Sequence, residues 1–152
     1  MAIPLKDKIY VLLQGIVFLS WILPVEIFTF SLPEVLRIAA VILTLAGAFL
    51  IVFAFIQLNT KISPFPSPVK GAKLVSSGVY AFVRHPIYAG ILYVAFGLSL
   101  WMGSGYKLLL TLVLLLVFWF KTNYEEERLQ KTFPEYEAYR AKKGRFFPKF
   151  NR

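Results

Sequence analysis

Two short polar runs, which flank a pair of apolar segments, carry the residue types best suited to chemistry. The first run, "FVRHPIYAG" at 82–90, contains the only histidine of the chain. Proline is favoured in the first turn of a helix, so Pro86 predicts a helix start. The unpaired N–H groups of such a helix attract a carboxylate or phosphate, and Arg84 would strengthen that site. In the simpler interpretation, Arg84 is an anchor at a membrane interface and His85 is a helix cap.

The second run is "FKTNYEEERLQ" at 120–130. If it is helical, Lys121 and Glu125 share one face, because they are four residues apart. Glu126 then points about 100° away from Glu125 around the helix. A carboxylate directed at the polar segment before Pro86 would suit ribose hydroxyls or an ammonium group. The alternative is a solvated helix end with an ordinary Lys–Glu pair.

The segments that position these runs are strongly apolar. Of the 152 residues, 58% are hydrophobic and only 16% are charged, which is too apolar for a soluble domain of this size. A helix needs about 20 residues to cross the membrane. Four membrane helices are predicted, at 9–30, 35–58, 86–102 and 106–120. The third is marginal, and the fourth reaches full length only if its helix continues into 121–131.

The first apolar segment is expected to be retained as a membrane helix. Lys6 and Lys8 resemble the basic start of a signal peptide, but no small-residue cleavage site follows. Gln14, Pro24 and Glu26 also interrupt the apolar block. We therefore predict an all-α, multi-pass integral membrane protein that forms a single domain over residues 1–152.

The basic residues predict the orientation of this domain. With four membrane helices, all but two of the 17 Lys and Arg residues lie on the side of both termini, and only Arg37 and Lys107 lie opposite. Both termini are therefore expected in the cytoplasm. Attraction of this face to anionic membrane lipids accounts for the net charge of +9, so no nucleic-acid partner is predicted. The chain has no cysteine, and no metal site is predicted.

The cytoplasmic segments are expected to form the site. Three prolines between residues 64 and 68 favour a stiff, extended backbone within the long 59–85 loop. In the tail, 121–152, Thr132 and Glu135 have the spacing of a capping box for a short helix. Within the membrane, three glycines are expected to permit close helix packing: Gly47, Gly90 and Gly97.

Taken together, these runs resemble the isoprenylcysteine carboxyl methyltransferase family. The resemblance rests on "LVSSGVYAFVRHPIYAG" (74–90), a membrane hairpin, "EEERL" (125–129) and "FPEYEAYRAKKGRFFP" (133–148). Membrane phospholipid methyltransferases share parts of the pattern. The resemblance implies that S-adenosylmethionine binds on the cytosolic side, between the 59–85 loop and the helix after the hairpin. It also implies a lipophilic acceptor, a small molecule or a lipid, which enters from the bilayer.

Carried over by this resemblance, Leu74 and Val75 form a backbone cradle for the cofactor, and Glu125 is its acidic ligand. A ring such as Tyr80 or Tyr88 would pack on the adenine or near the sulfonium. The full set of implied cofactor-binding residues is Leu74, Val75, Tyr80, His85, Pro86, Ile87, Tyr88, Glu125 and Glu126.

The implied catalytic residues are Lys121 and Arg84. Lys121 stands where the isoprenylcysteine enzymes carry an arginine that holds the substrate carboxylate. A lysine offers a point charge and lacks the bidentate fork of an arginine. This departure from the family bears on whether the substrate is a prenylcysteine, and it does not bear on the methyl transfer. The transfer would be an in-line displacement in a water-poor tunnel. For an amine or hydroxyl acceptor, His85 and Glu126 are the candidate bases.

Two alternatives remain open. Sterol reductases share a related carboxy-terminal architecture, so a membrane reductase that binds NADPH is one alternative. Its 2′-phosphate would require further basic residues, to which Lys70 and Lys73 could contribute. The other alternative is a non-enzymatic membrane scaffold, although a scaffold has no need of the two paired polar runs.

Overall fold

A computed structural model of the chain describes residues 4–58, 65 and 74–149. These residues form five α-helices, one short 3-10 helix and no strand, which confirms the all-α prediction. The elements are α1 (Leu5–Ile22), α2 (Glu34–Leu58), η1 (Gly78–Ala81), α3 (Pro86–Trp101), α4 (Gly105–Thr132) and α5 (Tyr136–Lys142). Outside the described residues lie the prolines of the predicted stiff loop and two lysines of the alternative nucleotide site: Pro64, Pro66, Pro68, Lys70 and Lys73.

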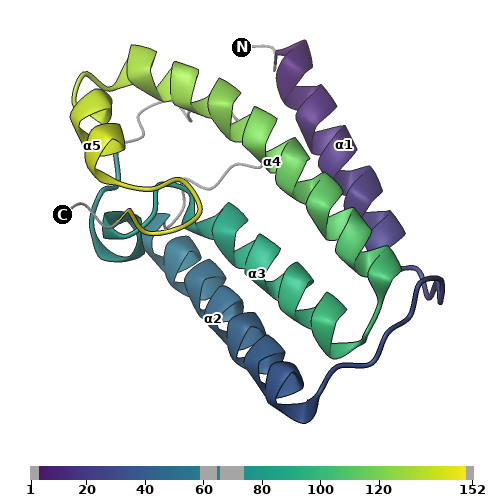
Figure 1. Ribbon diagram of the computed structural model, residues 1–152. Coiled ribbons are helices and arrows are strands. Elements are labelled where there is room, and N and C mark those ends of the chain that lie inside the picture. The colour runs from purple at the N-terminus through teal and green to yellow at the C-terminus, as the bar shows by residue number, and fades with distance from the viewer. Residues whose placement is uncertain (1–3, 59–64, 66–73, 150–152) are drawn as a thin grey trace.

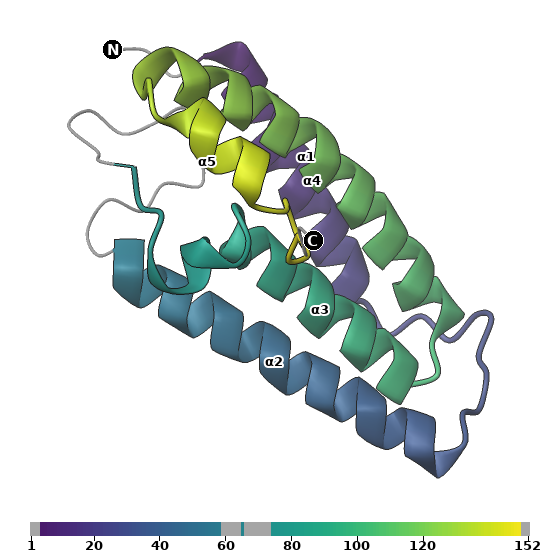
Figure 2. The same cartoon turned by 60° about the vertical axis from the view of Figure 1, so that its left-hand side comes forward.

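The four long helices lie side by side in the order α2, α3, α4, α1 (Figure 1). In the view of Figure 2, α2 and α3 again lie side by side and α1 lies behind α4. The helix α5 contacts η1 through the Tyr139 hydroxyl and the Tyr80 carbonyl. The start of α1, the end of α2, the start of α3 and the end of α4 share one end of this bundle with η1 and α5. We call it the η1–α5 end. Both polar runs of the sequence are therefore at the same end of the molecule.

Two of the helices are long and apolar enough to cross a membrane, judged by length and composition. They are α2, with 25 residues and a mean hydropathy of 2.8, and α4, with 28 residues and a mean hydropathy of 1.6. The helix α3 is apolar but shorter, with 16 residues. As expected, the fourth helix extends beyond residue 120: α4 continues to Thr132.

The predicted helix over 9–30 is wrong at both boundaries. The helix α1 begins four residues earlier and ends at Ile22. Pro24 disfavours a helical conformation in the residue before it, which accounts for the early end. The chain then continues as an irregular segment, in which the Phe30 N–H donates to the Gly103 carbonyl at 2.8 Å. This contact fastens the α1–α2 connection to the α3–α4 connection.

The predicted capping box before the short tail helix is also wrong. Thr132 is the last residue of α4, and its hydroxyl donates to the Arg128 carbonyl at 2.9 Å. The hydroxyl therefore serves the helix that ends there, a bond that threonine side chains commonly make within helices. The helix α5 does exist, but Glu135 precedes it without a side-chain capping bond.

The helices α2 and α3 pack backbone to backbone, which confirms the packing role expected for the glycines. A Cβ atom added to Gly47 would lie 2.6 Å from the Gly90 carbonyl oxygen. A Cβ atom added to Gly97 would lie 2.6 Å from the Ala40 carbonyl oxygen. Small residues permit this approach, which lets van der Waals contact extend along both helices.

Candidate active site

The segment before α3 is held in place by the end of the chain. The Arg84 N–H donates to the Gly144 carbonyl at 2.8 Å, and the His85 N–H donates to the Arg145 carbonyl at 3.2 Å. The next residue, Phe146, is buried, and its carbonyl accepts a 2.7 Å hydrogen bond from the Tyr93 hydroxyl. Residues 144–146 therefore form a strap across the entrance to α3.

A fully buried carboxylate joins α4 to this strap. Oε1 of Glu126 accepts a 3.0 Å hydrogen bond from Nε of Arg84 and lies 3.1 Å from Nε2 of His85. Oε2 lies 3.2 Å from Nε of Arg140 and 3.5 Å from Nη2 of Arg145. Charge-assisted hydrogen bonds of this kind are stronger than neutral ones. Glu126 thus connects α4, the segment before α3, α5 and the strap.

These contacts give the two residues before α3 partners within the protein. The helix begins at Pro86 and His85 takes the N-cap position, but the His85 side chain makes no capping bond. Its ring faces Glu126, as does the Arg84 guanidinium. The anion beside Arg84 is therefore the protein's own carboxylate. The roles of Arg84, His85 and Glu126 in ligand binding and catalysis stay predictions.

The neighbouring acid, Glu125, has a different environment. Its Oε2 accepts a hydrogen bond from the Tyr88 hydroxyl at 3.1 Å, and its side chain is partly exposed. The Tyr88 ring packs against Phe118, with the ring centroids 4.8 Å apart. Nζ of Lys121 lies 5.1 Å from the centroid of the Tyr88 ring. Tyr88, Lys121 and Glu125 therefore form one cluster between α3 and α4.

Lys121 has a direct partner that sequence reasoning missed. Its side chain is only 1% exposed, and Nζ donates a 2.6 Å hydrogen bond to Oε1 of Gln14, on α1. The predicted alternative, a solvated Lys121–Glu125 pair, is wrong in that the lysine is buried. The available signal was Gln14 itself, a polar residue within an apolar helix.

The remaining predicted residues lie around η1. Val75 and Ile87 pack against a small apolar cluster that includes Tyr80. Leu74, the residue before Val75, is partly buried. Oε1 of Gln57 accepts a 3.1 Å hydrogen bond from the Val79 N–H, which fastens η1 to the end of α2.

The conformation of η1 depends on a glycine. Gly78 has φ +56°, in the left-handed region that other residues rarely adopt. A Cβ atom there would also lie 1.4 Å from Nε2 of Gln57. The contact that fastens η1 to α2 therefore requires glycine at this position.

The helix α5 closes η1 from the other side. The Tyr139 hydroxyl donates a 2.6 Å hydrogen bond to the Tyr80 carbonyl. Burial raises the pKa of the Tyr139 hydroxyl to about 12, so the hydroxyl keeps its proton at neutral pH. Burial also raises the pKa of Tyr80 well above its ordinary value. Both tyrosines are therefore neutral hydrogen-bonding groups in this site.

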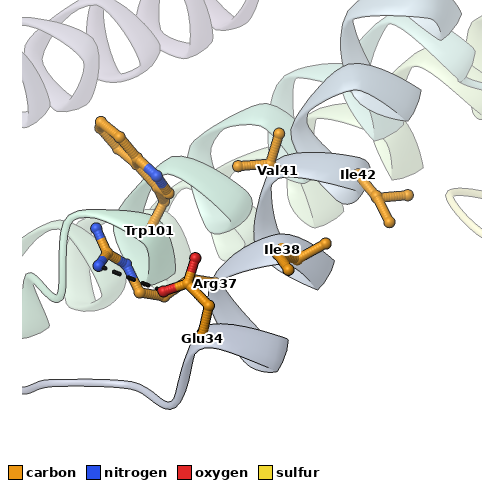
Figure 3. A pocket seen from close by; sticks show the side chains of 6 residues that line it. All are labelled: Glu34, Arg37, Ile38, Val41, Ile42 and Trp101. Atoms are coloured by element: carbon orange, nitrogen blue, oxygen red, sulfur yellow. Dashed lines mark ion pairs between the residues drawn. The ribbon is translucent and has the colours of Figure 1, made fainter.

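A separate groove lies at the opposite end of α2 and α3 (Figure 3). Its volume is about 240 Å³, and it is lined by Glu34, Arg37, Ile38, Val41, Ile42 and Trp101. Nη1 of Arg37 lies 3.9 Å from Oε2 of Glu34, and both side chains are solvent-exposed. Exposed ion pairs of this kind contribute little to the stability of a protein. None of the predicted site residues lines this groove, so the η1–α5 end remains the candidate active site.

A family model described as phospholipid methyltransferase matches residues 35–136. The matched range spans α2 to the start of α5 and contains Tyr88, Lys121 and Glu125. The chain belongs to the phospholipid methyltransferase family. This is the family of membrane methyltransferases that resemble the isoprenylcysteine carboxyl methyltransferases, so the resemblance drawn from the sequence is confirmed. No curated protein matched the chain.

The groups around Glu125 and the start of α3 can be compared with the chemistry of S-adenosylmethionine. Glu125 is a partly exposed carboxylate, which can accept hydrogen bonds from hydroxyl or ammonium groups. The Tyr88 ring lies beside it, and aromatic faces attract cations such as a sulfonium. The first-turn N–H groups of α3, at Ile87 and Tyr88, suit a carboxylate. These groups fit the cofactor, whereas the Arg84 charge is already paired with Glu126.

Proposed function

We propose that the protein is an S-adenosylmethionine-dependent methyltransferase that acts on a lipophilic acceptor entering from the bilayer. Family membership supports methyl transfer in a membrane. The observation that carries the rest is the cluster of Tyr88, Lys121 and Glu125, which combines a cofactor-binding acid, an aromatic face and a buried cation. We also propose four membrane passes with both termini in the cytoplasm, in line with the charge distribution.

In this proposal, the cofactor lies between η1 and the end of α4. Glu125 would hold its hydroxyl or amine groups, and Tyr88 and Tyr80 would contact its flat and cationic parts. Leu74, Val75, Pro86 and Ile87 would supply the apolar and backbone walls. When bound, S-adenosylmethionine supplies an electrophilic methyl group on its sulfonium.

Lys121 would hold the reacting end of the acceptor. Its ammonium lies on the α3-facing side of α4, over the ring of Tyr88 and four residues from Glu125. An acceptor that is already anionic needs no general base, because it carries the electron pair that forms the new bond. The apolar surroundings of Phe118 would exclude water, so the contribution of these residues is positioning and desolvation.

Cofactor affinity tests the proposal directly. Purified protein is titrated with S-adenosylmethionine by calorimetry. We expect Glu125→Gln to weaken binding about tenfold, because the variant loses a hydrogen bond to a charged carboxylate. Glu127→Gln is the matched control, because Glu127 is exposed two residues away and should bind as the wild type does. Absence of wild-type binding would contradict the proposal. Binding of NADPH in its place would favour a reductase.

A screen would then identify the acceptor. Labelled S-adenosylmethionine is supplied with membrane lipids, prenylated thiols or quinone-like compounds, and incorporation of label into the lipophilic fraction is measured. At a cofactor concentration near the wild-type Kd, incorporation that falls in Glu125→Gln and is kept in Glu127→Gln would identify a true substrate.

A further inference from the structure

The helix α1 lies outside the family-matched segment and nevertheless reaches the candidate site. It is an apolar helix that packs on α4. Two of its polar residues are shielded from solvent to different degrees: Asp7 is fully buried and Gln14 is partly buried. They are seven residues apart, about two helical turns, so they lie on the same face of α1. Gln14 contacts Lys121 directly, through a hydrogen bond.

The Gln14–Lys121 contact fixes the direction of a flexible cation. An ammonium has three N–H donors, and one of them is directed to Oε1 of Gln14 at 2.6 Å. On another side, Nζ faces the Tyr88 ring at 5.1 Å. A lysine lacks the rigid fork by which an arginine orients itself, so its position depends on such neighbours. The amide of Gln14 also orients the ammonium without adding a neutralising charge.

The position of α1 against α4 is set at the other end of the bundle. Nε1 of Trp21 donates to the Thr111 hydroxyl at 3.2 Å, and the Tyr106 hydroxyl donates to the Ser20 carbonyl at 3.1 Å. Nζ of Lys107 also donates to the Trp21 carbonyl. These bonds are remote from Lys121. A change at Gln14 is therefore expected to alter the site while α1 stays docked.

We infer that α1 completes the acceptor site, with Gln14 as a positioning residue that directs the Lys121 ammonium to the anionic group of a lipophilic acceptor. This inference rests on the proposed function, and it adds that the family-matched segment is incomplete without α1. Gln14 acts through Lys121, so its replacement should affect recognition of the acceptor anion and leave cofactor binding intact.

Two matched probes test this inference. Palmitate and hexadecanol have the same chain length, but only palmitate carries an anionic end group. Binding of each to purified protein, already saturated with S-adenosylmethionine, is measured by native mass spectrometry. We expect the wild type to prefer palmitate, and Gln14→Leu to reduce that preference about tenfold. The S-adenosylmethionine affinity of Gln14→Leu is expected to equal that of the wild type.

Further variants distinguish positioning from structure. Lys121→Met should lose the same preference, and the double variant should lose no more than either single variant, because the two residues act as one unit. Gln14→Glu should also lose it, since a carboxylate would neutralise the ammonium. Gln130→Leu, an exposed glutamine of α4, is the control that should behave as wild type.

Two results would overturn the inference: a wild type without preference for palmitate, or a folded Gln14→Leu protein with the full wild-type preference. Either result would leave the proposed function standing if S-adenosylmethionine still binds. If Gln14→Leu does not fold, as judged by cofactor binding, Gln14→Glu decides between the same outcomes.

Discussion

At the residue scale, two adjacent glutamates of α4 have different partners and different degrees of exposure. Glu126 is fully buried and contacts three arginines and His85, whereas Glu125 is partly exposed and contacts Tyr88. The difference follows from helix geometry, since consecutive side chains point about 100° apart. We therefore assign a structural part to Glu126 and propose a ligand-binding part for Glu125.

Replacing Glu126 should destabilise the protein. In Glu126→Ala, the cations that surround the carboxylate lose their common partner, and breaking a buried ion pair typically costs about 3–5 kcal/mol. Thermal unfolding of purified protein should show a clear fall in Tm. Glu127→Ala is the matched control, because surface substitutions usually stay within about 0.5 kcal/mol. A wild-type Tm for Glu126→Ala would show that Glu126 is not a structural hub.

The assignment also predicts how His85 behaves. His85→Ala removes a ring that contacts Glu126 but leaves Arg84, Arg140 and Arg145 in place. We expect the variant to fold with a modest fall in Tm, smaller than that of Glu126→Ala in the same assay. Equal losses in the two variants would mean that the histidine contact, and not the arginines, dominates the network.

At the scale of elements, the bundle depends on one close helix pair and one hydrogen-bonded closure. The α2–α3 pair contains glycines where a side chain would meet the backbone of the other helix. The α5–η1 closure rests on the bond from Tyr139 to the Tyr80 carbonyl. Both features affect the site. Gln57, at the end of α2, holds η1 by a hydrogen bond, and α5 places Arg140 beside Glu126.

Two glycine substitutions should have opposite effects. In Gly47→Val, the new side chain begins 2.6 Å from the Gly90 carbonyl oxygen, so α2 and α3 must separate and the Tm should fall. In Gly15→Ala, the added Cβ has nothing within 4 Å, and alanine favours a helix over glycine by about 0.5–1 kcal/mol. Gly15→Ala should therefore keep or raise the Tm. Thermal unfolding of both variants checks the contrast.

The α5–η1 closure should weaken at high pH. The pKa of Tyr139 is about 12 in the folded protein and near 10 in an unfolded chain. The folded state therefore binds more protons between these values, so the stabilisation is complete below pH 10 and lost as the pH rises toward 12. The Tm difference between wild type and Tyr139→Phe should shrink across this window. A constant difference would contradict the assignment.

For the molecule as a whole, the candidate site lies at one end of the bundle, and both the first described helix and the segment after α5 contact it. The strap at residues 144–146 holds the start of α3, and α1 supplies Gln14 to Lys121. Neither segment belongs to the family-matched range of 35–136. The parts of the chain outside that range thus complete the surroundings of the matched core.

The proposed orientation has a direct test. In the predicted four-span topology, all but two of the 17 Lys and Arg residues fall on the side of both termini, so both termini should face the cytoplasm. Reporter fusions at Ala2 and Arg152 should be active only with a cytoplasmic reporter. An outward-facing terminus would place the site on the other side of the membrane and remove the basis for a cytosolic cofactor.

Features that depend on near neighbours in the chain could be predicted from the sequence alone. Pro86 sets a helix start through its own ring, the run after Phe120 continues a helix, and the glycines mark close packing. The motifs at 74–90 and 125–129 were sufficient to indicate the family. Even local signals fail where two helices compete for one residue, as at Thr132, whose hydroxyl serves α4.

The pairing of the polar groups, by contrast, depends on how the helices pack. Glu126 contacts residues 41 and 42 positions before it, and Lys121 meets Gln14 across 107 positions. Such pairs depend on how each helix is rotated about its axis and how closely it packs on its neighbours. Two adjacent acids look equivalent in a sequence, but packing buried one among arginines and left the other beside Tyr88. The structural part assigned to Glu126 and the ligand-binding part proposed for Glu125 follow from that packing, because burial and partners determine whether a charge is available to a ligand.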